Sequence, residues 1–179
     1  CFGIWGDDPL RSHAATFYQA VRTMITILRP GQEPLEIDFI LLDFEGTLAS
    51  DRRVHPKAKD KINLLSKRTK IYILTKEEKE PLEEVLKKVK AEIIYLKEGE
   101  TSQKKLGLLR QLGASRTVAI GNGVDDASMI EEAGLGICVM GKEGTFSEAM
   151  KKADVVFMNI LDALDFLLKP LRQKATLGR

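Results

Sequence analysis

The chain has 179 residues, and its 28 basic and 26 acidic side chains leave a formal charge of +2 at pH 7. This near balance gives no electrostatic reason to expect a nucleic acid partner. The sequence contains neither an apolar run near the roughly 18 residues of a membrane-spanning helix nor a basic-then-apolar leader, so we expect no membrane partner and a cytoplasmic location.

Residues 1–23 are unlike the remainder of the chain in composition. They predict a short helix over 12–21, with Ser12 as its N-cap. Met24 is a natural start, so we interpret residues 1–23 as an N-terminal extension of non-native origin and residues 24–179 as one folded domain.

From residue 24 onward, strand and helix patterns alternate. Extended aliphatic runs predict strands over 24–28, 35–42, 71–74, 93–96, 118–120, 136–140 and 155–158. Apolar stripes at helical spacing predict helices over 56–65, 78–90, 101–112, 127–133, 146–152 and 161–168. This alternation predicts right-handed crossovers and a parallel sheet with helices on both faces. The expected fold is therefore α/β, a Rossmann-like three-layer α/β/α sandwich with a mainly parallel sheet.

Two of these helices carry clear sequence signals. Pro56 opens the first, whose expected apolar stripe consists of Ala58, Ile62, Leu64 and Leu65. Thr101 or Ser102 is expected to cap the helix over 101–112, and Gly113 to close it.

Polar side chains follow several of the predicted strands. Asp43 and Glu45 come directly after a buried apolar run, and Thr75 and Lys76 follow the next strand. The turn Gly121-Asn-Gly-Val-Asp-Asp126 follows another. Acids at the carboxyl ends of parallel strands lie in the crevice where open α/β sheets bind ligands.

Each signal also has a simpler interpretation. Asp43 and Glu45 fit an ordinary polar turn, Thr75 fits a strand end, and an aspartate of the later turn fits a helix N-cap. Lys104 and Lys105 fit surface charges on a helix. Together the signals indicate more, because acids from two strands can hold Mg²⁺, while a hydroxyl and an ammonium can bind phosphoryl oxygens.

In this order the motifs resemble those of the haloacid dehalogenase superfamily of phosphohydrolases, and within it the P-type ATPase phosphorylation domain. Asp43-Phe-Glu-Gly-Thr47 resembles that domain's Asp-Lys-Thr-Gly-Thr, and Gly121-Asn-Gly-Val-Asp-Asp126 resembles its Gly-Asp-Gly-Val-Asn-Asp. The segments Gly134-Leu-Gly-Ile-Cys-Val-Met-Gly141, Gly144-Thr145 and Ala153-Asp-Val-Val156 continue the match. The resemblance covers residues 24–179 and is closest to small soluble P-type ATPase-like proteins, which lack membrane helices.

The resemblance implies an Mg²⁺-dependent phosphatase. Asp43 would be the nucleophile that takes the phosphoryl group as an aspartyl-phosphate, and Glu45 would occupy the position of the general acid/base. Thr75 would hydrogen-bond a phosphoryl oxygen. Lys105, which fits the family's spacing better than Lys104, would neutralise charge on that group.

The resemblance also implies the metal and substrate ligands. Asp43, Asp126 and the carbonyl of Glu45 would bind Mg²⁺, and Asp125 would add a carboxylate near the metal. The remaining substrate-binding positions would be Gly46, Thr47, Lys76 and Asn122.

Two residues depart from the family pattern. Glu45 replaces the usual Asp and carries its carboxylate one methylene further, and Asn122 replaces an Asp near the metal. We therefore expect slow turnover or altered metal affinity. The alternative interpretation is a catalytically weakened phosphate- or partner-binding regulatory module of the same fold.

The family usually inserts a cap domain after the first motif or before the lysine. Residues 48–70 predict one helix, and residues 76–104 predict one helix and one strand, so neither gap holds a cap. An uncapped site suits a large phosphorylated substrate, or a homo-oligomer in which a neighbouring subunit supplies walls.

Overall fold

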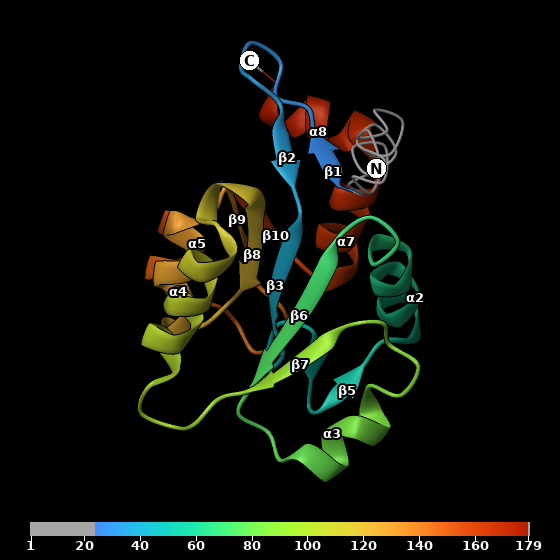
Figure 1. Ribbon diagram of the computed structural model, residues 1–179, viewed down its shortest axis with the longest axis vertical. Coiled ribbons are helices and arrows are strands. Elements are labelled where there is room, and N and C mark those ends of the chain that lie inside the picture. The colour runs from blue at the N-terminus through green and yellow to red at the C-terminus, as the bar shows by residue number, and fades with distance from the viewer. Residues whose placement is uncertain (1–23, 179) are drawn as a thin grey trace, which may run out of the picture.

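The computed structural model describes residues 24–178 (Figure 1). The predicted helix over 12–21 and the N-terminal extension lie outside these residues. A six-stranded parallel sheet forms the middle layer, with the strand order β10-β9-β8-β3-β6-β7. Its strands are β3 (Phe39–Asp43), β6 (Lys70–Thr75), β7 (Glu92–Tyr95), β8 (Thr117–Gly121), β9 (Leu135–Val139) and β10 (Val155–Phe157). The predicted α/β sandwich is confirmed.

Helices cover both faces of this sheet. They are α2 (Pro56–Leu65), α3 (Lys79–Val85), α4 (Thr101–Leu112), α5 (Ala127–Glu132), α6 (Ser147–Lys152), α7 (Ile160–Leu168) and α8 (Pro170–Leu177). In Figure 1, α4 and α5 stand to the left of the sheet and α2 and α7 to the right. Short 3₁₀ turns at Ala114–Arg116 and Val124–Asp126 precede β8 and α5.

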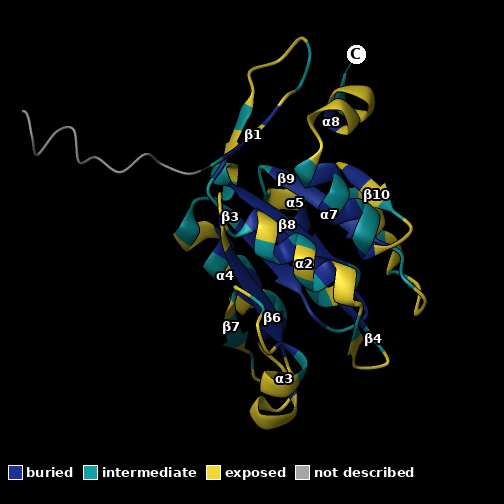
Figure 2. Cartoon of the chain, turned by 90° about the vertical axis from the view of Figure 1, so that its right-hand side faces the viewer, coloured by how far each residue is buried: buried dark blue, intermediate teal, exposed yellow. Residues whose placement is uncertain are grey.

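The central strand β3 divides the core between the two layers. Ile40 and Leu42 pack with α2 and α7, whereas Leu41 packs with α4 and α5. This alternation follows from the period of two in a strand, and a strand buried on both faces reads as a continuous apolar run. Figure 2 shows the buried sheet between helices whose outer sides are exposed.

Two antiparallel hairpins lie outside the main sheet. β1 (Ile25–Ile27) pairs with β2 (Leu35–Ile37), and β4 (Ala49–Ser50) pairs with β5 (Arg53–Val54). The predicted strand over 35–42 is therefore two strands. The division falls at Asp38, whose carboxylate accepts hydrogen bonds from the Arg116 guanidinium and could not sit unpaired inside a buried strand.

The sequence did not predict β4 and β5, which directly follow the Asp43 loop. The turn between them places Asp51 and Arg52 at φ values of 51° and 60°, in the left-handed region. Two-residue hairpin turns with positive φ at both central positions match the twist of the strands. Neither residue is a glycine or asparagine, so the usual sequence signal for such a turn is absent.

Two helix predictions are corrected. The helix predicted over 78–90 ends with α3 at Val85, and Lys88 adopts a φ of 68°, which no helix tolerates. Leu64 is 49 % exposed because it lies off the stripe formed by Ala58, Ile62 and Leu65.

One helix cap differs from expectation, and one helix was not expected. The N-cap of α4 is Glu100, and the predicted cap Thr101 is instead the first helical residue, with its hydroxyl donating to the carbonyl of Lys97. The helix α8 was not predicted; Pro170 at its first position starts a new helix immediately after α7.

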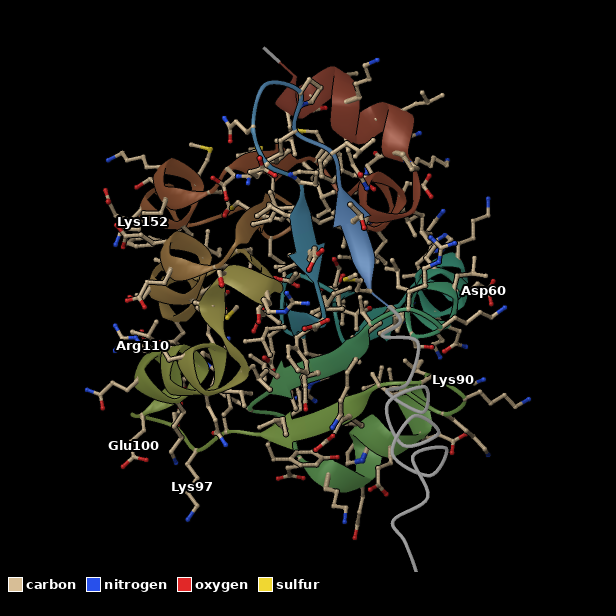
Figure 3. The ribbon with its side chains drawn as sticks, turned by 45° about the horizontal axis from the view of Figure 1, so that its top comes forward. Asp60, Lys90, Lys97, Glu100, Arg110 and Lys152 are labelled. Atoms are coloured by element: carbon tan, nitrogen blue, oxygen red, sulfur yellow. The ribbon has the colours of Figure 1, made fainter. Side chains whose placement is uncertain are left out.

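Charged side chains of the described chain mostly face solvent. Lys90, Lys97 and Glu100 point outward in Figure 3, and all three are exposed. Cys138 is fully buried in β9. Within residues 24–178, none of the helices has the length and apolar character needed to cross a membrane.

Candidate active site

The carboxyl ends of β3 and β8 bring together the two aspartates of the predicted metal site. Asp43 is the last residue of β3, and Asp126 closes the turn that follows the neighbouring strand β8. Their exposed fractions are only 3 % and 2 %. Adjacent parallel strands end at the same edge of a sheet, so residues far apart in sequence meet there.

Lys105 joins these carboxylates from α4. Its Nζ lies 2.5 Å from Asp43 Oδ1 and 2.7 Å from Asp126 Oδ1, and its side chain is 3 % exposed. Lys104, the neighbouring residue, is exposed and pairs with Glu100 at 2.7 Å. Successive helical residues point about 100° apart, so only one of the two lysines can face the site.

The electrostatics of this cluster follow from its burial. Desolvation, and then the nearby Asp126, raise the pKa of Asp43 to about 8 against the opposing effect of Lys105. Burial alone would lower the pKa of Lys105, but the two carboxylates outweigh it and hold that pKa above its usual value. At neutral pH the Asp43 carboxyl therefore keeps a proton, and a cation bound beside both acids would favour its ionised form.

The turn after β8 orients Asp126. Its Oδ2 accepts hydrogen bonds from the backbone N–H groups of Asn122, at 3.0 Å, and Gly123, at 2.9 Å. A Cβ added at Gly121 would lie 2.4 Å from Asp126 Cγ, so the close approach requires glycine there. The second carboxylate oxygen, Oδ1, is left to face Lys105.

Asn122 connects three loops at the edge of the site. Its Oδ1 accepts a hydrogen bond from Thr47 Oγ1 at 3.1 Å, and its Nδ2 donates to the carbonyl of Gly144 at 3.2 Å. Gly46, at a φ of 72°, passes so close that a Cβ there would lie 2.5 Å from Asn122 Nδ2. A carboxylate in place of this amide could not donate to Gly144, which gives a structural reason for asparagine at this position.

Glu45 reaches the end of β6, the strand beside β3. Its Oε1 accepts a hydrogen bond from the hydroxyl of Thr75, a fully buried residue, and from the backbone N–H groups of Lys76, at 2.9 Å, and Glu77, at 3.2 Å. The predicted catalytic residues Glu45 and Thr75 are therefore in direct contact. The two amides went unpredicted because every residue type carries a backbone N–H, so no sequence signal marks them.

The predicted residues Lys76 and Asp125 face each other. Lys76 Nζ lies 3.4 Å from Asp125 Oδ2 in a half-exposed ion pair. Asp125 therefore pairs with Lys76, whereas its neighbour Asp126 pairs with Lys105. Sequence patterns do not reveal this pair, because both partners are surface side chains on separate loops.

The donors present fit a magnesium ion. Asp43 and Asp126 each direct an oxygen at the same ammonium, so both carboxylates can reach one shared cation. Among residues 24–178, no cluster of three or more His, Cys, Asp or Glu side chains forms a metal site. Mg²⁺ does not need one, because it is usually held by one or two carboxylates together with substrate phosphate and water.

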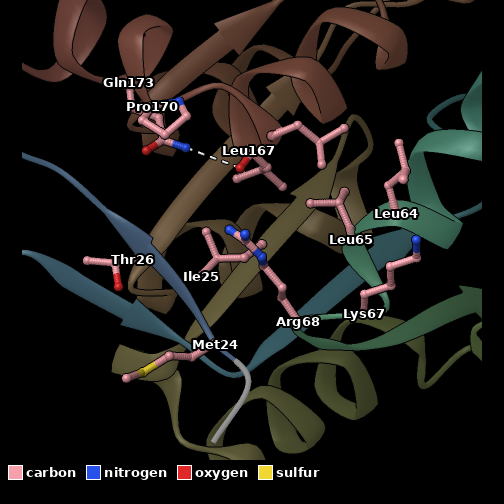
Figure 4. Close-up of a pocket in the computed structure, with 11 residues that line it drawn as sticks. Met24, Ile25, Thr26, Leu64, Leu65, Lys67, Arg68, Leu167, Pro170 and Gln173 are labelled. Carbon is pink, nitrogen blue, oxygen red and sulfur yellow. Dashed lines mark hydrogen bonds between the residues drawn. The ribbon is translucent and has the colours of Figure 1, made fainter. Parts of the chain in front are cut away.

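Of two cavities in the described chain, one is lined by predicted site residues and the other is not. A polar pocket of about 470 Å³ lies beside Glu45 and Lys76 and is also lined by Arg52, Glu77, Glu78 and Pro81. A larger one, of about 580 Å³, is lined by residues such as Arg68 and Gln173 (Figure 4). It adjoins the segment that precedes β6, at the amino end of the sheet, and contains none of the predicted site residues.

No protein-family model matches the chain. The uncharacterized protein MJ0073 of Methanocaldococcus jannaschii is 42% identical to it over 84 residues, which cover 45% of this chain and 90% of that protein. This level of identity shows common family membership over the matched part.

Among solved structures, the 3-deoxy-D-manno-octulosonate 8-phosphate phosphatase of Moraxella catarrhalis, in complex with magnesium, phosphate and KDO, has a TM-score of 0.62 at 17% identity, covering 75% of this chain and 87% of that one. The cobalt-bound deoxy-D-mannose-octulosonate 8-phosphate phosphatase from Haemophilus influenzae also has a TM-score of 0.62 at 17% identity, covering 78% of this chain and 91% of that one. A putative haloacid dehalogenase superfamily hydrolase of Legionella pneumophila has a TM-score of 0.61 at 17% identity, covering 79% and 86%. The chain therefore belongs to the family of the Methanocaldococcus jannaschii protein, and its fold is the haloacid dehalogenase fold.

Proposed function

We propose that the chain is an Mg²⁺-dependent phosphohydrolase that works through an aspartyl-phosphate on Asp43. The observation that carries this proposal is the convergence of Asp43, Asp126 and Lys105 in a buried cluster at the carboxyl edge of the sheet. Similarity in fold to solved phosphatases supports it. The motifs around Asp43 and Asp126 further support placement in the soluble P-type ATPase-like subgroup, and we propose a cytoplasmic location.

The chemistry divides into two displacements. Asp43 Oδ1 is held by Lys105, which leaves Oδ2 to attack the phosphorus atom. The ester oxygen departs with a proton from Glu45. The same carboxylate, now ionised, takes a proton from water, whose oxygen attacks the aspartyl-phosphate, releasing phosphate and restoring Asp43.

Charge stabilisation accompanies both steps. The Lys105 ammonium is fixed beside Asp43 before the reaction begins, so it stabilises developing charge with no cost of reorganisation. Asp43, Asp126 and the carbonyl of Glu45 would hold the magnesium ion, which supplies positive charge to the phosphoryl oxygens. The donors of Thr75 and Lys76 would bind those oxygens from the other side.

The substrate is proposed to be a phosphate ester with a polar leaving group. The pocket beside Glu45 is lined mostly by charged side chains and is open to solvent. Residues 48–100 contain no cap domain, only the β4–β5 hairpin, α2, β6, α3 and β7. A large substrate fits such a site, as does a homo-oligomer that completes its walls.

The test is a screen of phosphorylated metabolites with Mg²⁺, run on the wild type and on Asp43→Asn. Asp60→Asn makes the same chemical change at an exposed position of α2 and serves as the matched control. We expect hydrolysis by the wild type and the control but none by Asp43→Asn. Equal hydrolysis by Asp43→Asn would exclude Asp43 as the nucleophile.

A second candidate is a regulatory module that binds phosphate without turning it over. It is favoured by the structural engagement of Asn122 with Thr47 and Gly144, and by the position of Glu45 on Thr75. Saturable phosphate binding by the wild type together with no hydrolysis across the screen would support this module over the enzyme.

A further inference from the structure

The end of β6 forms a compact anion site, which we call the Thr75 nest: the Thr75 hydroxyl and the backbone N–H groups of Lys76 and Glu77. All three donors converge on one oxygen, Glu45 Oε1. The Glu77 N–H also lies 3.0 Å from Thr75 Oγ1, so the hydroxyl can accept from it and aim its own proton at Glu45. Hydrogen bonds to a charged oxygen are about twice as strong as neutral ones.

This nest contains the donors that the proposed function assigns to a phosphoryl oxygen. Two anionic oxygens cannot occupy the same three donors, since each would lose its hydrogen bonds and repel the other. The nest borders the 470 Å³ pocket, so an anion from solvent can reach it.

We infer that Glu45 is a built-in competitor of the phosphoryl group, holding the Thr75 nest until substrate displaces it. The inference rests on the proposed function only for the identity of the anion that takes the nest. Displacement releases the Glu45 carboxylate into the pocket, where the leaving group lies. Once released, the Glu45 carboxylate can take a proton from solvent and then donate it to the leaving group, so acid catalysis follows binding of the phosphoryl group.

The glutamate side chain itself suits this role. Its backbone is held beside Asp43 by the Gly46 turn, and the extra methylene lets its carboxylate reach the neighbouring strand end. An aspartate at this position is shorter by that methylene. Glu45→Asp should accordingly hold the nest less well and compete less with phosphate.

The experiment measures the affinity for inorganic phosphate by titration calorimetry in the presence of Mg²⁺. The proteins are the wild type, Glu45→Ala, Glu45→Asp and Glu78→Gln. Glu78 lines the same pocket and is exposed, so Glu78→Gln removes one negative charge without emptying the nest. If Glu45 occupies the nest in ten molecules of every eleven, its removal tightens the apparent Kd about elevenfold.

We expect tighter binding of about tenfold for Glu45→Ala, an intermediate gain for Glu45→Asp, and little change for Glu78→Gln. Unchanged or weaker binding by Glu45→Ala would overturn the inference. An equal gain in Glu78→Gln would do the same, because the effect would then be general charge repulsion.

A second readout uses the wild type alone and does not depend on a variant folding. In a crystal structure with bound phosphate, a phosphate oxygen should accept from Thr75 Oγ1 and Lys76 N, with Glu45 turned away. Phosphate bound elsewhere, with Glu45 still on Thr75, refutes the inference. Neither readout requires turnover, so both are independent of the Asp43→Asn test of the proposed function.

Discussion

Replacing Lys105 by methionine tests the buried cluster most directly. The change keeps the length of the side chain but removes the ammonium that lies 2.5 and 2.7 Å from two carboxylates. Removing one partner of a buried ion pair typically costs about 3–5 kcal/mol, because the remaining charge is left uncompensated. For a domain of this size, that loss corresponds to about 6–20 °C in Tm.

The assay is denaturant unfolding in EDTA, with Lys104→Met as the matched control. Lys104 is exposed, and its ion pair with Glu100 is worth little, so the control should stay within about 0.5 kcal/mol of the wild type. Mg²⁺ should restore part of the stability of Lys105→Met by binding the same carboxylates; saturation at 100 times Kd adds about 2.7 kcal/mol.

Activity should follow the same pattern, with phosphatase turnover lost in Lys105→Met and kept in Lys104→Met. Equal stability of the two variants would refute the reasoning. It would mean that the Lys105 ammonium does not compensate a buried carboxylate in the folded protein.

Four further outcomes are expected. Glu45→Gln should lower turnover by about 10²–10⁴-fold while Mg²⁺ binding persists, and unchanged turnover would remove Glu45 from proton transfer. Burial raises the pKa of Asp43 to about 8 from an ordinary 3.8, so between these pH values the folded state binds a proton that the unfolded state has released. In EDTA, the free energy of unfolding should therefore fall as pH rises from about 4 to 8. Asp43→Asn should flatten that dependence. Gly121→Ala should destabilise the protein by forcing a Cβ to 2.4 Å from Asp126 Cγ, whereas Gly107→Ala, in open space on α4, should stabilise it by about 0.5–1 kcal/mol; similar unfolding midpoints would contradict the turn geometry. Mg²⁺ should raise the Tm of the wild type but not of Asp126→Asn, and an equal rise in both would place the metal elsewhere.

The sequence by itself determined the architecture and which residues form the buried cluster. Every predicted strand from residue 71 onward lies within one residue of its observed bounds, because alternating and apolar runs record which faces are buried. The motif around Asp43 and the turn ending at Asp126 followed from residue type and order. The spacing implied by the family resemblance selected Lys105 over Lys104, and helical geometry required that only one of these adjacent residues face the site.

The tertiary structure alone decided where the flexible polar side chains go. Glu45 lies on Thr75 and two backbone amides, and Asp125 pairs with Lys76. These contacts depend on which hydrogen-bond donors the separate loops place within reach of each carboxylate. Two of the donors are backbone amides, which every residue type except proline carries, so the sequence cannot mark them. The β4–β5 hairpin and the early end of α3 escaped prediction for a related reason: residues 51 and 88 adopt left-handed backbone conformations without glycine, which the surrounding contacts, and not the local sequence, impose.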